Sequence, residues 1–179
     1  MAERIDIFNR LGQATGHTQL RSEELLEDAW YQIVIIWTRD GDGKLLMTRR
    51  GPEKRFFPGC WEVTEGFAQA GEGPYEAAKR ELREETGLEP EDSRWRYLGR
   101  IWKQSNLAGH HYQSMVNVYL VTLDEQEPEV CCQPEEVTEA RWVTAEEYLA
   151  IPEEEQESFT PECFRHFRKE ICAEIKKRK

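Results

Sequence analysis

Residues 66–88 read GFAQAGEGPYEAAKRELREETGL, and this stretch decides the fold that we predict for the whole chain. Its glycine-rich first part predicts a loop that ends near residue 74. A helix is predicted from about residue 75 to residue 86, because Gly87 stands where helices commonly end in a left-handed conformation. At helical spacing Tyr75, Ala78 and Leu82 share one face, which indicates a buried seam.

Three carboxylates lie beside that seam. At roughly 100° per residue, Glu81, Glu84 and Glu85 fall within one arc of about 100°. Such like charges repel one another when they are partly desolvated, so a bare cluster is a poor structural choice. A bound divalent cation reverses the sign of that energy, and hard oxygen ligands without Cys or His indicate Mg²⁺ or Mn²⁺ rather than zinc. The alternative is a solvated helix face with pairs such as Arg80–Glu84, four residues apart.

The spacing of the fixed residues decides between these interpretations. In chain order the stretch holds Gly66, five residues, Glu72, seven residues, Arg80-Glu81-Leu82, one residue, Glu84-Glu85, one residue and Gly87-Leu88. At every fixed position it resembles the signature of the Nudix hydrolases. From average residue usage, a chance match is on the order of 10⁻⁷ per chain. We therefore expect a functional site at this helix.

The resemblance implies a fold, a site and a reaction. The fold is an α/β (α+β) one: a Nudix-type α/β/α sandwich around a mixed sheet. The metal ligands would be Glu81, Glu84, Glu85 and the carbonyl of Gly66, and Arg80 would hold the loop acid Glu72 in place. Which glutamate acts as the general base stays open. The implied reaction is metal-dependent hydrolysis of a nucleoside or other organic diphosphate linked to a second moiety, with cleavage of the pyrophosphate bond.

Length and composition are those of a globular chain with one main domain. The 179 residues contain 39% hydrophobic and 11% aromatic residues, enough for a sizeable core. We expect residues 1–28 to form an N-terminal extension, and residues 29–179 to form the main domain with a C-terminal helix over residues 160–178. The sequence has no run of 18 apolar residues and no signal peptide, so we expect a cytoplasmic protein.

Charge and cysteine content exclude other classes. A net charge of −11 disfavours binding to nucleic acid or to an anionic membrane, which both favour excess Lys and Arg. It permits a small anionic substrate if a cation and a local basic patch screen the charge. The five cysteines are odd in number and lack C-x-x-C spacing, which argues against a disulfide framework or a zinc ribbon. A homodimer is possible.

The segments before residue 66 predict the first part of the sheet. Residues 3–9 alternate apolar and polar and predict a short strand, the first half of an N-terminal hairpin. This hairpin is either a packing extension or a lid or dimer contact. The near-continuous apolar run 29–38 predicts a central strand covered on both faces. The Asp-Gly-Asp-Gly turn at residues 40–43 then leads into a strand over residues 44–50.

Four cations stand shortly before the signature stretch of this acidic chain. They are Arg49, Arg50, Lys54 and Arg55. Because they precede a phosphate-type site, we consider them candidates for contact with substrate phosphate. The alternative is that they cap the strand or pair with surface carboxylates.

After the helix the pattern predicts strands over residues 95–103, 110–121 and 137–143, separated by polar loops that include residues 104–109 and 127–136. Nudix enzymes commonly draw an extra ligand or base from a loop such as the last one, so Glu136 is a candidate; the alternative is a charged, soluble loop. The pair His110-His111 either touches substrate or faces solvent. Thr144 is expected to cap a short helix over residues 145–150.

Two functions are alternatives to hydrolysis: isomerisation of an isoprenoid diphosphate and non-catalytic nucleotide sensing. The layout before the signature resembles the branch of the superfamily that contains isopentenyl-diphosphate isomerase and related hydrolases. The isomerases carry a cysteine where this chain has residues 62–66, and a metal-binding histidine where it has residues 30–32. Neither is present, and the paired Glu84-Glu85 is intact, so hydrolysis is favoured. A non-catalytic nucleotide sensor is disfavoured because it would not need the complete set of signature residues.

Overall fold

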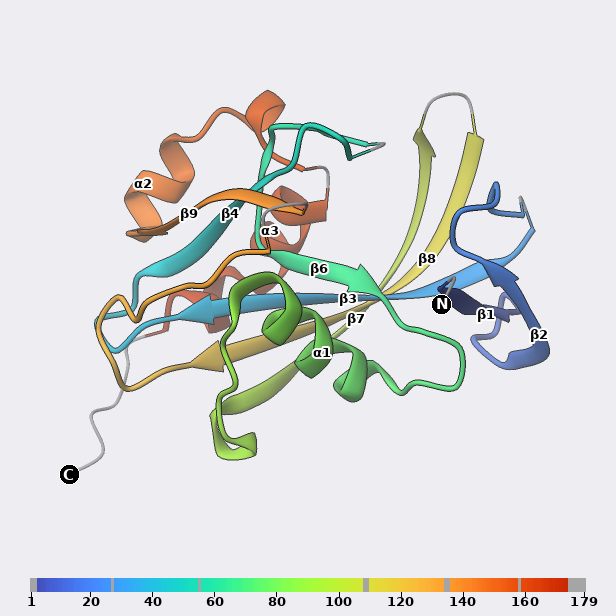
Figure 1. The fold of residues 1–179 in the computed structure, drawn as a ribbon, viewed down its shortest axis with the longest axis horizontal. Coiled ribbons are helices and arrows are strands. Elements are labelled where there is room, and N and C mark those ends of the chain that lie inside the picture. Colours follow the sequence, from blue (N-terminus) through green and yellow to red (C-terminus); the bar gives the residue numbers. More distant parts are fainter. Residues whose placement is uncertain are drawn as a thin grey trace.

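Strand β3 (Trp30–Arg39) runs through the middle of a mixed sheet (Figure 1), as the apolar run predicted. The computed structural model describes residues 3–26, 28–54, 56–107, 110–133, 136–157 and 159–173. One edge of β3 pairs along its whole length, in parallel, with β8 (His110–Thr122). The other edge pairs antiparallel with β1 (Arg4–Phe8), β6 (Thr64–Phe67) and β4 (Leu45–Arg50) in turn.

The remaining strands extend the sheet on both sides. Strand β7 (Trp95–Leu107) pairs antiparallel with β8, and β2 (Ala14–Leu20) pairs with β1. Strands β5 (Trp61–Glu62) and β9 (Val137–Val143) flank β4. The β3–β8 pair is parallel and the other pairs are antiparallel, so the sheet is mixed as expected.

Helices cover both faces of the sheet (Figure 1). Val34 and Ile36 pack with helix α1 (Pro74–Thr86) on one face. Ile35 and Trp37, which alternate with them along β3, pack toward α2 (Ala145–Ala150) and α3 (Phe159–Ile171) on the other. Two 3₁₀ turns, Asp92–Arg94 and Glu153–Glu155, complete the order. The expected mixed α/β architecture is confirmed.

Helix α1 has the ends that its sequence specifies. Pro74 occupies the first turn, where its missing N–H costs nothing. Gly87 adopts φ 72° and donates its N–H to the carbonyl of Arg83, which ends the helix. Ala78 and Leu82 are fully buried against β3. This packing fixes the direction of the edge that carries the three glutamates.

The predicted N-terminal hairpin is present as β1 and β2. Its first strand is tied to the loop of the signature stretch, because Ala70 N donates to Arg4 O (2.8 Å) and Gly71 N donates to Asp6 Oδ2 (2.7 Å). Ile5 is buried in a small cluster with Tyr31. The hairpin therefore packs on the segment that holds the expected site.

Two predicted boundaries are wrong. Residues 104–107 belong to β7 rather than to a loop, because the facing residues 110–113 of β8 supply a full set of strand partners. Helix α3 ends at Ile171 rather than at residue 178; Arg39 Nη1 donates to the carbonyls of Ile171 (3.3 Å) and Ala173 (2.7 Å) at that end. Residues 174–179 lie outside the described part.

Two further findings bear on class. The five cysteines are all free thiols. Within the described residues, no helix has the length and apolar character needed to cross a membrane. The short helix α2 begins with the expected capping box between Thr144 and Glu147.

Candidate active site

Arg80 organises the loop that precedes α1. Its Nε and Nη2 donate to the two carboxylate oxygens of Glu72, at 3.0 and 2.9 Å, and Nη2 also donates to Phe67 O at 2.9 Å. Burial alone would lower the pKa of Arg80, but the hydrogen bonds and charges of Glu72 and Glu81 raise it. A bidentate, partly buried pair of this kind fixes the loop against the helix.

The three glutamates of α1 run from the interior to the surface. Glu81 and Glu85 are 6% and 3% exposed, whereas the Glu84 side chain is 43% exposed. Arg80 Nη1 donates to both Glu81 Oε1 (2.8 Å) and Glu84 Oε2 (3.1 Å). Glu85 Oε2 is buried without a hydrogen-bond partner among the described residues. An unpaired buried carboxylate oxygen is costly and calls for a cation or a proton.

Gly66 makes room for Glu81. A Cβ at position 66 would lie 2.1 Å from both Cδ and Oε1 of Glu81, so no other residue fits without moving that carboxylate. The backbone of Gly66 is held in β6 opposite Val34. The α-carbon of Gly66 is therefore held close against the Glu81 carboxylate.

The charge balance of this edge favours protonation or a cation. Burial raises the pKa of Glu81 to about 7, although the Arg80 guanidinium opposes the shift. Burial also raises the pKa of Glu85 well above its usual value, and the neighbouring Glu62 and Glu81 add to this effect. The ionised form of each carboxylate is therefore unfavourable here, and a bound cation would stabilise it.

The oxygen donors of this edge are of the type that binds a hard divalent cation, but in this structure they do not converge on one point. In the described part of the chain, no three His, Cys, Asp or Glu side chains converge on a point where a metal could bind. The reason is visible in the contacts of Arg80, whose Nη1 engages Glu81 and Glu84 together. The all-oxygen donor set and the unpartnered oxygen of Glu85 fit Mg²⁺ or Mn²⁺ rather than zinc.

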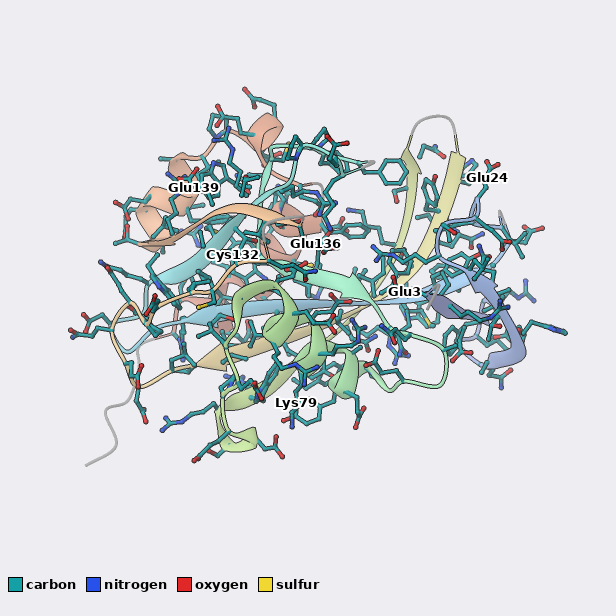
Figure 2. All side chains as sticks on the ribbon, in the orientation of Figure 1. Glu3, Glu24, Lys79, Cys132, Glu136 and Glu139 are labelled. Atoms are coloured by element: carbon teal, nitrogen blue, oxygen red, sulfur yellow. The ribbon has the colours of Figure 1, made fainter. Side chains whose placement is uncertain are left out.

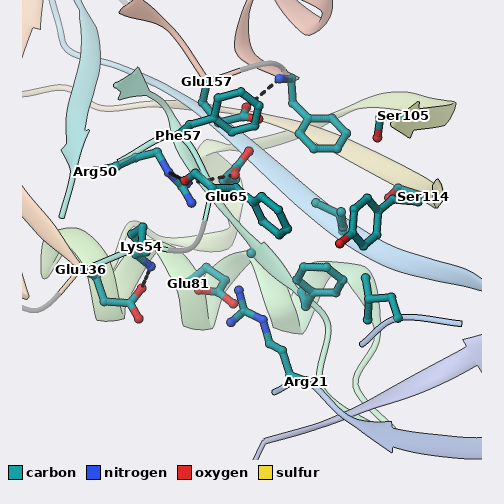
Figure 3. A pocket seen from close by; sticks show the side chains of 17 residues that line it. Arg21, Arg50, Lys54, Phe57, Glu65, Glu81, Ser105, Ser114, Glu136 and Glu157 are labelled. Atoms are coloured by element: carbon teal, nitrogen blue, oxygen red, sulfur yellow. Dashed lines mark hydrogen bonds and ion pairs between the residues drawn. The ribbon is translucent and has the colours of Figure 1, made fainter. Parts of the chain in front are cut away.

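A cavity of about 120 Å³ opens beside this edge. Figure 3 shows Glu81, Lys54, Glu136 and Arg21 at one end and Phe57 with Glu157 at the other. Lys54 Nζ donates to Glu136 Oε2 at 2.7 Å, so these two candidates from separate loops meet at the cavity. We call the two ends the carboxylate end and the aromatic end.

Both arginines proposed as phosphate contacts already pair with carboxylates, although Arg50 lines the cavity. Arg50, only 12% exposed, pairs with Glu62 and Glu65 and donates Nε to Phe56 O. Arg49 lies outside the cavity, where it donates to Gly59 O (3.0 Å) and lies 3.6 Å from Glu139. Figure 2 shows Glu139 toward α2, well away from Glu136.

The remaining candidates from the sequence are Arg55 and the two adjacent histidines. Arg55 lies outside the described residues, as does the side chain of His110. His111 is exposed on β8 and does not line the cavity.

Several cavity residues were missed by sequence reasoning. Arg21, the residue that follows β2, reaches the carboxylate end, and its guanidinium lies 4.8 Å from the centre of the Phe67 ring. Glu157, just before α3, is buried and accepts hydrogen bonds from Phe159 N (2.6 Å) and Thr160 N (3.3 Å). Glu65 lines the cavity, and burial raises its pKa, with a further contribution from Glu157. The charge of Glu65, adjacent to Gly66, was the one available sequence signal.

Several known proteins are similar to this chain in sequence. The NUDIX domain family matches residues 30–166. A Nudix hydrolase of Deinococcus radiodurans is 31% identical over 150 residues, which cover 83% of this chain and 82% of the relative. An isopentenyl-diphosphate delta-isomerase of Phaffia rhodozyma is 34% identical over 144 residues, which cover 71% of this chain and 55% of that relative.

Several solved structures have a fold similar to that of this chain. A Deinococcus radiodurans crystal structure matches with a TM-score of 0.75 and 27% identity, covering 96% of this chain and 100% of that chain. The NUDIX domain of Shewanella oneidensis NrtR, solved with ADP ribose, matches at 0.65 and 19% identity over 80% of this chain and 89% of that one. A bifunctional NMN adenylyltransferase/ADP ribose pyrophosphatase of Francisella tularensis was solved with AMP and a Mn ion. It matches with a TM-score of 0.63 and 16% identity, covering 79% of this chain and 42% of that chain.

The last two likenesses show the fold alone. The family match spans most of the chain, and the Deinococcus relative is similar over more than four fifths of both sequences. The chain therefore belongs to the NUDIX family and is a Nudix-type diphosphate hydrolase.

Proposed function

We propose that the chain hydrolyses a nucleoside diphosphate linked to a second moiety and cleaves the pyrophosphate bond with Mg²⁺. The observation that carries this proposal is the edge of α1, where buried Glu85 and exposed Glu84 flank Glu81, and Glu81 lines a cavity together with Lys54. Such an edge has excess negative charge facing a space that a cation and a diphosphate can enter. The net charge of −11 supports a small-molecule substrate rather than nucleic acid.

Each residue of the edge has a role in this proposal. Glu81, Glu84, Glu85 and the Gly66 carbonyl would hold Mg²⁺, or Mn²⁺ in its place. Arg80 would release Glu81 and Glu84 while its Nε and Nη2 keep Glu72 and Phe67 O. When bound, the divalent ion neutralises phosphate charge and lowers the pKa of a coordinated water.

The chain's own residues orient substrate and move the proton. Lys54 and Arg21 line the carboxylate end, and their positive charges would contact phosphate oxygens. A water attacks one phosphorus, the bridging P–O bond breaks, and a carboxylate of the set Glu84, Glu85 and Glu136 accepts the proton of the water. The products are two phosphate esters, or one ester and a phosphate.

The nucleoside part of the proposal is supported by the neighbours. The Shewanella domain was solved with ADP ribose and the Francisella enzyme with AMP and a Mn ion. These ligands belong to those proteins, and they make ADP-ribose the first compound to test here.

The similarity to an isopentenyl-diphosphate isomerase supports a second candidate, namely an isomerase-like reaction on an isoprenoid diphosphate. The absence of cysteine from residues 62–66 weighs against it. Incubation of the pure protein with Mg²⁺ and a panel of ADP-ribose, dinucleoside polyphosphates and isoprenoid diphosphates separates the two. Release of AMP or phosphate supports the hydrolase, whereas an allylic product from isopentenyl diphosphate without phosphate release contradicts it.

A further inference from the structure

The cavity has aromatic walls whose rings come from four separate segments of the chain. The cavity-lining rings are Phe56, Phe57, Phe67, Tyr112 and Phe159. Phe56 and Tyr112 meet edge to face with 5.7 Å between their centres. These rings give the cavity flat apolar walls.

Phe57 is held in a conformation that bulky residues avoid. Its φ is 52°, in the left-handed region, and the one other non-glycine residue of the described chain with a positive φ is Glu127. Surrounding bonds enforce this geometry: Arg50 Nε donates to Phe56 O (3.1 Å), and Cys60 N donates to Phe57 O (3.2 Å). Strain that the surroundings impose in this way is typical of functional positions. Figure 3 shows the result, with the Phe57 ring beside the cavity.

The same end also offers a hydrogen-bonding group. Ser105 Oγ, on β7, lines the cavity and is buried without a hydrogen-bond partner among the described residues. Ser114, on the facing strand, lines it too and is buried. A hydrocarbon tail would leave the Ser105 hydroxyl unsatisfied, whereas a flat ring with polar edge atoms would pair with it. Flat faces with a polar edge are the chemistry of a nucleobase.

We propose that Phe57 is the specificity-determining residue for the nucleoside part of the substrate: its ring stacks on the base, and Ser105 Oγ hydrogen-bonds the edge of the base. This inference rests on the proposed function for the position of the diphosphate at the carboxylate end. It explains why the chain maintains a strained phenylalanine at this loop, since an unstrained backbone would present the ring differently.

The test uses two probes that differ by the base alone, AMP and ribose 5-phosphate, with binding measured by calorimetry. The wild-type chain is expected to bind AMP more tightly. Phe57→Leu keeps an apolar side chain but removes the flat face, so it should lose about 5- to 100-fold in AMP affinity, the usual range for one stacked base, with ribose 5-phosphate affinity unchanged. Phe57→Tyr should bind AMP as the wild type does. Ser105→Ala should lose AMP affinity alone, by a smaller factor.

Equal AMP affinity in wild type and Phe57→Leu overturns the proposal, as does an equal loss for both probes or a wild type that binds both alike. Should Phe57→Leu fail to fold by circular dichroism, Ser105→Ala provides the same comparison. Glu127→Gly is the matched control, because it removes the other left-handed non-glycine residue far from the cavity and should leave both affinities unchanged. Base-dependent binding without hydrolysis of any diphosphate would refute the proposed function and leave this inference standing.

Discussion

Two arginines hold carboxylates on either side of the cavity, and they differ in what surrounds them. Arg80 contacts Glu72, Glu81 and Glu84, which all lie in the signature stretch, and one of these partners is 43% exposed. Arg50 contacts Glu62 and Glu65 from two neighbouring strands, and Glu62 is 1% exposed. The first group therefore reaches solvent through Glu84, whereas Arg50, Glu62 and Glu65 are 12%, 1% and 15% exposed.

From this difference we expect that Arg80 can exchange some of its carboxylate partners for a cation, whereas Arg50 cannot. Arg80 Nη1 can leave Glu81 and Glu84 when a stronger cation arrives, because Nε and Nη2 still hold the loop. Arg50 is the guanidinium that pairs with Glu62, whose burial already raises its pKa to about 7. Removing Arg50 would leave an uncompensated buried charge. We therefore expect the Arg80 group to bind metal and the Arg50 group to support the fold.

The largest expected effect is on stability, from Arg50→Met. Deleting one partner of a buried ion pair commonly costs about 3–5 kcal/mol, and Arg50 and Glu62 are 12% and 1% exposed. Urea unfolding at pH 8, above the Glu62 pKa of about 7, should show this loss. The adjacent Arg49 is the matched control, because it is 48% exposed and its ion pair is worth at most about 1 kcal/mol. Equal losses in the two variants would show that Arg50 is not the structural cation.

Next in size is the effect of Glu84→Gln on catalysis. Loss of a metal ligand or base should lower turnover at least about 100-fold. The fold should remain intact, since the side chain is 43% exposed. Steady-state rates with ADP-ribose and a thermal unfolding curve check both parts. Glu89→Gln, an exposed glutamate just beyond the helix, is the control and should be active. Near-normal turnover in Glu84→Gln would remove that residue from the catalytic set.

The same contrast explains what could be predicted from sequence. The Arg80 group lies on one loop and one helix, so helical geometry and spacing alone bring Glu81, Glu84 and Glu85 to one edge. The Arg50 group depends on the register of β4 against β5, which pairs Thr48 with Glu62 and brings segments twelve residues apart together. Single-sequence patterns predict strands but not their register, so the pairing of Arg50 with Glu62 could not be predicted.

Tertiary pairing also decided the parts of the cavity that were missed. Residues 104–106 are polar and resemble a loop, yet they continue β7 because β8 faces them, and this places Ser105 at the cavity. Arg21 reaches the cavity because the hairpin is bonded to the signature loop across 65 residues of sequence. Neither contact has a local signal in the chain.

Metal binding gives a smaller effect that does not depend on activity. A cation at ten times its dissociation constant should stabilise the native state by about 1.4 kcal/mol. Mg²⁺ or Mn²⁺ should therefore raise the unfolding midpoint of the wild type, and chelation should reverse the rise. In Glu84→Gln the rise should shrink, because that variant removes one of the expected ligands. An equal rise in wild type and Glu84→Gln would place the cation elsewhere.

The smallest stability effect is expected for Lys54→Met, and it sharpens the comparison most. Lys54 and its partner Glu136 are 20% and 37% exposed, so their ion pair is worth about 1 kcal/mol or less. If Lys54 instead contacts substrate phosphate, its loss removes a charge-assisted hydrogen bond and should raise KM about tenfold while kcat changes little. Lys44→Met is the matched control: Lys44 also pairs with an exposed glutamate, Glu127, but lies outside the cavity, so KM should not change. A lysine that costs little stability yet controls KM would set Lys54 apart from Arg50, only four residues earlier in the chain; an unchanged KM in Lys54→Met would remove Lys54 from the phosphate contacts.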